Sequence, residues 1–199
     1  MEGERSTSKP QMAVCIVDDP DKIRLLADFT RTEIIRLLSK YPMTETQLSE
    51  QLGLTKAAVG YHLHLLMEAR LIRIEKVEAE KHGILQKYYS PIAALLIVDP
   101  NRIPKDVRRY FIQTQIEHLI GMFSVFQLYH HVSKVSSGTL EKLAVAMLKQ
   151  LKDVGQKHMK EEMTEDAETL KVKVYAEALA SLTKQKEWRT LFQKSKARA

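Results

Sequence analysis

The sequence predicts a mainly α-helical protein that contains one β-hairpin. Three observations predict this fold class. Two short helical segments joined at a glycine lie between Thr44 and Arg70. Two β-rich runs follow them directly, at 71–77 and 84–90. The second half holds long segments whose apolar residues recur at spacings of three and four. Two short helices followed by a hairpin are the pattern of a winged helix-turn-helix, so we expect that fold in the N-terminal half and long helices in the C-terminal half.

Composition limits the classes of protein that remain. The 199 residues suffice for one large or two small domains, and 44% of them are hydrophobic, as in proteins that bury a core. The longest apolar run, 92–98, is too short to cross a membrane, and the first ten residues lack the apolar core of a secretory signal. The single cysteine, Cys15, excludes an internal disulfide and suits a reducing compartment. We therefore expect a cytoplasmic protein with no membrane partner.

The charge permits a nucleic-acid partner but is unevenly placed. The formal net charge is +6 and the pI is near 9.3. Residues 1–100 hold 13 Lys and Arg against 14 Asp and Glu, whereas residues 101–199 hold 18 against 11. The half with the helix-turn-helix is therefore close to neutral. Phosphate contacts there would have to come from local clusters of basic side chains.

The chain before the helix-turn-helix predicts a strand and two helices. The apolar run Met12–Val17 predicts a short edge strand. Asp19 followed by Pro20 is a favourable helix start, with an acidic cap and proline in the first turn. The next helix is predicted to begin at Thr30, with Glu33 as its capping-box partner.

The helix-turn-helix carries its own start and stop signals. Thr44 and Gln47 form a capping box for the first helix, and Gly53 suits its C-terminal cap. Thr55 then caps a second helix, whose buried face is Val59, Leu63 and Leu66. The small, polar and aromatic residues of its other face are predicted to approach base edges in a major groove, together with Thr55: Lys56, Ala57, Gly60, Tyr61 and His64.

The segment 55–72, TKAAVGYHLHLLMEARLI, resembles the recognition helix of ArsR-type winged-helix regulators. It has their His-Leu pair, a Leu three residues later, then Glu-Ala and an apolar pair. The resemblance covers roughly residues 20 to 90 and implies a winged helix-turn-helix that binds DNA. One departure is Arg70, where the family usually has Gly at a position that suits the left-handed conformation. We therefore predict a strained or differently shaped turn at Arg70.

The hairpin after this helix corresponds to the wing, with a polar tip that ends in Gly83. A wing beside a recognition helix commonly touches backbone phosphate. Its basic residues are candidate phosphate contacts: Lys76, Lys81, His82 and Lys87. Two acidic neighbours, Glu78 and Glu80, favour the alternative, a solvated hairpin tip.

The second half predicts helices that pack on one another or on another copy. The run 92–98 is consistent with a strand or with a short buried helix. A long helix over 104–135 has apolar residues on more than one face, which indicates burial on two sides. A seam of a bundle or coiled coil follows at Leu140, Leu143, Met147, Leu151 and Val154. A third helix after Thr164 is lined by Leu170, Val174, Ala178 and Leu182.

The sequence offers little support for a metal site or for catalysis. His158 and Glu161 have a usable helical spacing, but two ligands do not make a site, and there is no cysteine pair. No Gly-rich phosphate loop, nucleophile elbow or H-E-x-x-H motif is present. We therefore expect no cofactor, no metal and no enzymatic activity. A cluster at Met122, Phe123, Phe126 and Tyr129 is consistent with an effector pocket or with plain core or a dimer interface.

These observations predict a disordered tail over 1–11, a DNA-binding winged helix-turn-helix over 12–99 and a helical dimerisation domain over 100–199. The predicted function is sequence-specific binding of double-stranded DNA by a homodimer that regulates transcription. One alternative is a winged-helix module that docks on the transcription machinery, which the near-neutral N-terminal half favours. The other is a repressor that responds to a metal or to a small-molecule effector of unknown identity.

Overall fold

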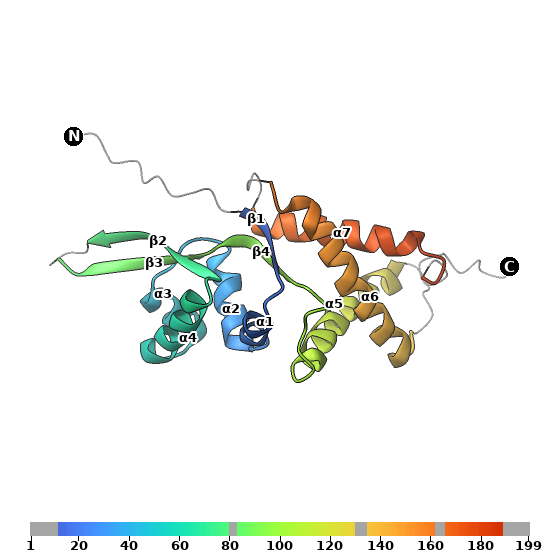
Figure 1. Ribbon diagram of the computed structural model, residues 1–199, viewed down its shortest axis with the longest axis horizontal. Coiled ribbons are helices and arrows are strands. Elements are labelled where there is room, and N and C mark those ends of the chain that lie inside the picture. The colour runs from blue at the N-terminus through green and yellow to red at the C-terminus, as the bar shows by residue number, and fades with distance from the viewer. Residues whose placement is uncertain (1–11, 80–82, 130–134, 162–165, 189–199) are drawn as a thin grey trace.

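The computed structural model describes residues 12–79, 83–129, 135–161 and 166–188. Its winged helix-turn-helix contains α1 (Pro20–Leu26), α2 (Phe29–Leu38), α3 (Glu45–Leu52), α4 (Lys56–Glu68) and a hairpin of β2 (Ile72–Ala79) and β3 (Leu85–Pro91). The long helices are α5 (Arg108–Tyr129), α6 (Ser137–His158) and α7 (Ala167–Lys184). The two groups of helices lie at opposite ends of an elongated molecule (Figure 1). The predicted fold class is confirmed.

The predicted caps of the helix-turn-helix are confirmed. The Thr44 N–H donates to Gln47 Oε1 at 2.9 Å, and the Gln47 N–H donates to Thr44 Oγ1 at 3.2 Å. Gly53 is left-handed with φ of 64°, and Thr55 Oγ1 accepts from the Ala58 N–H at 3.2 Å. These local bonds fix the end of α3 and the start of α4. The turn between the two helices is therefore well defined.

The predicted start of α2 is wrong. Asp28, not Thr30, caps the helix, and its carboxylate accepts from the Arg31 N–H at 2.9 Å. Phe29 and Thr30 are already helical. An aspartate caps at least as well as a threonine, and its charge also interacts favourably with the helix N-terminus.

The turn after α4 has the expected strain at Arg70, whose φ is 54°. The Arg70 N–H donates to the Met67 carbonyl, and the Leu71 N–H donates to the Leu66 carbonyl, both at 2.9 Å. This pair of bonds is a Schellman motif, which normally places glycine at the left-handed position. The turn therefore has the usual shape, and an arginine occupies its strained position.

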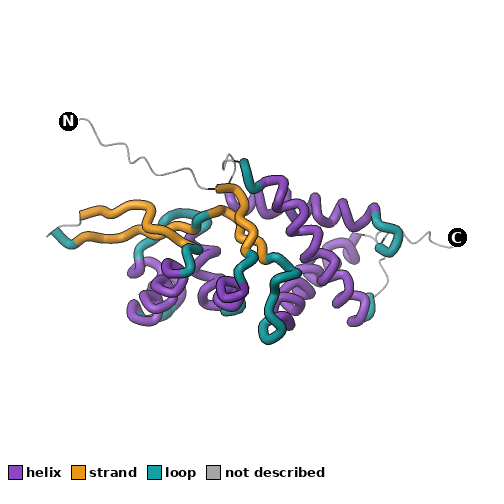
Figure 2. Tube along the Cα trace, viewed as in Figure 1, coloured by secondary structure: helices purple, strands orange, loops and turns teal. Residues whose placement is uncertain are grey.

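A two-stranded parallel sheet joins the two groups of helices. It pairs β1 (Met12–Val17) with β4 (Ala93–Val98), from Met12 opposite Ala93 to Val17 opposite Val98. These strands stand between the helical groups in Figure 2. Val17 packs in the core under the winged helix, whereas Val14 and Ile97 pack in the core of the long helices. The sheet therefore contributes side chains to both cores, and the run 92–98 forms a strand.

The seam of α6 is buried within the chain. Leu143, Met147, Leu151 and Val154 are each at most 5% exposed, in one core with the lining residues of α7. The α6 helix packs on α5, α7 and β1. The α5 helix is buried on two sides as predicted, because Phe111 packs against the winged-helix core and Leu119 lies in the other core. The seam therefore finds its packing partners in its own chain.

Candidate nucleic-acid interface

The α4 helix presents the two faces that its sequence predicts. Its apolar face is fully buried, with Val59, Leu63 and Leu66 at 2% exposure or less. On the other face Gly60 is half-buried, and the remaining predicted residues are exposed: Thr55, Lys56, Ala57, Tyr61 and His64. Tyr61 is 61% exposed. A large aromatic side chain in solvent, beside a lysine and a histidine, is suited to contact with a nucleic acid.

Two acidic side chains adjoin this face, and neither belongs to the site that the sequence predicts. Glu68 Oε1 lies 3.4 Å from His64 Nε2, one helical turn away, and both side chains are exposed. Glu45, in the first turn of α3, lies over Gly60, where an added Cβ would be 3.2 Å from Glu45 Oε1. A side chain at position 60 would therefore require the Glu45 carboxylate to move by a few tenths of an ångström. A glycine inside an otherwise regular helix was the available signal for such a contact.

The two lysines on the wing strands differ in their surroundings. Lys76 Nζ lies 2.6 Å from Glu78 Oε1 and 4.5 Å from the centre of the Tyr88 ring. The hydrogen bond between Lys76 and Glu78 raises the pKa of Lys76 and lowers the pKa of Glu78. Lys87 is exposed, opposite Val77 in the hairpin register, and has no ion-pair partner among the described residues. The predicted tip residues Lys81 and His82 lie outside the described residues.

Histidines in the described ranges do not converge on a metal centre. No group of three or more His, Cys, Asp or Glu side chains with metal-binding geometry occurs in those ranges. Buried His158 lies between two carboxylates, with Nδ1 2.7 Å from Glu161 and Nε2 3.5 Å from Glu177. Because the two glutamates approach different ring nitrogens, one ion cannot take the imidazole and both carboxylates as ligands.

The predicted effector cluster is only partly described. Phe123 is buried, and Met122 packs against the same core, as plain core residues do. The side chains of Phe126 and Tyr129 lie outside the description. In the described part of the chain, no helix has the length and apolar character needed to cross a membrane.

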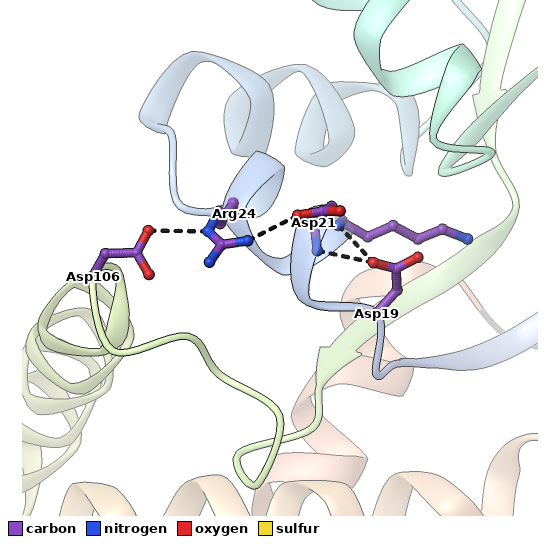
Figure 3. Close-up of polar contacts among 5 residues, drawn as sticks. Asp19, Asp21, Arg24 and Asp106 are labelled. Carbon is purple, nitrogen blue, oxygen red and sulfur yellow. Dashed lines mark hydrogen bonds and ion pairs between the residues drawn. The ribbon is translucent and has the colours of Figure 1, made fainter.

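Ion pairs connect the winged helix to the long helices. Arg24 of α1 lies between Asp106 and Asp21 in Figure 3, with its Nε 3.0 Å from Asp106 Oδ2 and an Nη 2.8 Å from Asp21 Oδ1. Lys152 of α6 lies 2.7 Å from Asp99 at the end of β4, in a partly buried pair. Together with the shared sheet, these contacts join the N-terminal and C-terminal groups of helices.

The fold and this surface define a class of domain: a winged helix-turn-helix like that of ArsR-type regulators. Residues 28–73 match the family model described as "Bacterial regulatory protein, arsR family", from the cap of α2 into β2. A particular relative is the HTH-type transcriptional regulator KmtR of Mycobacterium tuberculosis, 36% identical over 67 residues. That match covers 34% of this chain and 50% of the relative, so the chain spans half the length of the curated relative it matches.

Proposed function

We propose that the protein binds double-stranded DNA sequence-specifically through α4 and so regulates transcription, without catalysis. The observation that carries this proposal is the division of α4 into a buried apolar face and an exposed face with Lys56, Tyr61 and His64. The family match over 28–73 supports it, because it spans this helix and its caps. We assign residues 12–99 to DNA binding and place the protein in the cytoplasm.

Different residues on α4 serve affinity and sequence preference. Lys56 is exposed in the first turn of α4 and has no ion-pair partner in the described ranges, so it suits a phosphate. Tyr61 and His64 lie further along the same face, where side chains reach base edges in the major groove. The N-terminal half is close to neutral, so it exerts little long-range attraction on DNA. Each exposed cation such as Lys56 therefore contributes a larger share of the DNA affinity.

Binding measurements on duplexes identified by genomic footprinting test this assignment. Lys56→Ala should weaken binding to every sequence and reduce the salt slope by about one. The double variant Tyr61→Ala, His64→Ala should mainly lower the preference for the footprinted site, by roughly 1–3 kcal/mol per lost base contact. Lys142→Ala, an exposed lysine on α6, is the matched control and should change neither quantity. Unchanged footprints and salt slopes in all variants would instead support docking on the transcription machinery.

We further propose that residues 100–199 hold two copies together through the stretch 104–182, so that two α4 helices read one duplex about one helical turn (~34 Å) apart. Since the α6 seam is buried within the chain, the support comes from exposed apolar side chains on the outer surfaces of the long helices. These include Ile120 on α5 at 47% exposure and Val172 on α7 at 67%.

Sedimentation of the full chain at micromolar concentration tests this assembly, with Ile120→Glu and Val172→Glu as separate variants. We expect a dimer that at least one variant dissociates, with weaker DNA binding as the consequence. A fragment ending at residue 100 would expose Val14 and Ile97, which α6 covers, so the full chain is the proper sample. A full-length monomer at that concentration would contradict the proposal.

A further inference from the structure

The exposed face of α4 lacks a side chain at its centre. Positions four apart on a helix lie on the same face, so Lys56, Gly60 and His64 follow one another along α4 at steps of about 6 Å. Lys56 and His64 are exposed, whereas Gly60 is half-buried. Between the lysine and the histidine, α4 therefore offers no functional group of its own.

A carboxylate from the neighbouring helix lies over this position. Glu45 Oε1 and Oε2 are 3.2 Å and 3.4 Å from the place that a Cβ on Gly60 would take. Glu45 belongs to the first turn of α3, whose start is fixed by the capping box of Thr44 and Gln47. The stripe on α4 therefore has an acidic group between Lys56 and His64, and α3 supplies it.

The Glu45 carboxylate is not used by the fold. Glu45 is half-buried, and it makes no ion pair or side-chain hydrogen bond with any other described residue. Neither of its oxygens is among the fully buried polar atoms of the described residues that lack a partner, so both reach solvent. Glu68, by contrast, lies 3.4 Å from His64 Nε2. An ionised carboxylate only accepts hydrogen bonds, so Glu45 can accept them from a ligand on this face.

We propose that Glu45 determines sequence preference by accepting a hydrogen bond from the N4 amino group of a cytosine in the major groove. This inference rests on the proposed function and names the base that the centre of the α4 face recognises. A phosphate cannot be the partner of Glu45, because both groups are negative.

The edges of the four bases explain the choice of cytosine. In the major groove guanine presents two acceptors and thymine presents one, and these repel a carboxylate. Adenine has a donor beside an acceptor, whereas cytosine presents a donor and no acceptor. A carboxylate placed against any other base loses water without gaining an equivalent hydrogen bond. Glu45 therefore acts mainly by penalising wrong bases, while the neighbouring Lys56 supplies affinity for the duplex.

Selection from randomised duplexes with the full chain tests the inference. The unchanged protein should select cytosine at one position of its site. Glu45→Gln keeps the size of the side chain and adds a donor, so it should change that position to adenine, which pairs with an amide through N6 and N7. Glu50→Gln is the matched control, because it removes the same charge from an exposed position on the same helix and should leave the cytosine in place. Circular dichroism spectra and urea midpoints should agree among the three proteins, since neither glutamate is buried.

A change of one base atom group gives a second measurement. The selected cytosine is replaced by 2-pyrimidinone, which lacks the N4 amino group. This change should weaken binding of the unchanged protein about tenfold and should leave binding of Glu45→Ala unaffected, because that variant has no carboxylate to accept the bond.

Two results would overturn the inference while leaving the proposed function intact. One is the same selected site for Glu45→Gln and the unchanged protein. The other is a gain of affinity in Glu45→Gln that is equal for all four bases, which would show that Glu45 only repels the duplex. If the unchanged protein selects no sequence at all, the proposed function itself fails, and the inference fails with it.

Discussion

Gly155 of α6 lies so close to the β1–β4 sheet that any added side chain would require a neighbouring side chain to shift. A Cβ added there would be 2.5 Å from Ile97 Cδ1, 3.2 Å from Ile16 Cδ1 and 3.3 Å from Val14 Cγ1. Val14 is fully buried and Ile97 is 8% exposed, so neither can swing into solvent. The helix therefore packs on the sheet through a glycine, and Gly155→Ala should force Ile97 out of its position.

Two opposing effects set the size of the change. Alanine is favoured over glycine inside a helix by about 1 kcal/mol, whereas an extra methyl in a filled core typically costs about 1–3 kcal/mol. Gly155→Ala should therefore lower the free energy of unfolding by roughly 0–2 kcal/mol. Gly121→Ala in α5 is the matched control, because nothing lies within 4 Å of its added Cβ. It should raise the free energy of unfolding by roughly 1 kcal/mol.

Urea unfolding followed by circular dichroism measures these differences. Ile97→Val removes the clashing Cδ1 atom and alone should cost about 0.5–1.5 kcal/mol. Combined with Gly155→Ala, it should restore space, so the double variant should be about 1 kcal/mol more stable than the sum of the two single effects. If Gly155→Ala is as stabilising as Gly121→Ala, or if the two changes simply add, the reasoning about this contact is refuted.

Three further predictions concern the turn, the ion pair and the metal content. Arg70→Gly should raise the free energy of unfolding by about 1 kcal/mol because it relieves the left-handed strain, whereas Arg70→Val should lower it; equal thermal midpoints in both would contradict this. Burial raises the pKa of Asp99, but hydrogen bonds from Lys152 and the Asn101 N–H outweigh this and lower the pKa overall. Its contribution to stability is therefore present above the unfolded pKa of about 3.9 and lost as the pH falls through the lowered folded value. Lys152→Met should thus destabilise by roughly 1–3 kcal/mol at pH 7, and its effect should diminish as the pH falls through the lowered folded pKa of Asp99, as urea titrations over a series of pH values will show. Elemental analysis after mild dialysis should find no stoichiometric zinc or nickel, and one ion per chain would overturn that expectation.

The sequence by itself determined the features whose physical cause is local. Thr44, Gln47 and Gly53 set the ends of α3 through bonds to residues a few positions away, so their roles could be predicted from spacing alone. The exposed face of α4 followed from its helical period. The strain at Arg70 followed from the resemblance to a family that usually has glycine at that position. The wrong prediction of Thr30 as the cap of α2 also has a local cause, because Asp28 is a competing cap two residues earlier.

Only the tertiary structure decided the features that depend on distant partners. The parallel pairing of β1 with β4 brings together runs that lie on either side of the whole winged helix, and periodicity does not specify a partner for either one. The extra residue beside Ile74 reverses the faces of Lys76 and Val77, because a shift of one position in a strand moves every later side chain to the opposite side. The α6 seam is equally suited to another copy or to its own chain, and the sheet beneath Gly155 together with α5 and α7 fills that surface. Burial and register depend on which surfaces meet in space, and that information lies in the packing of the whole chain.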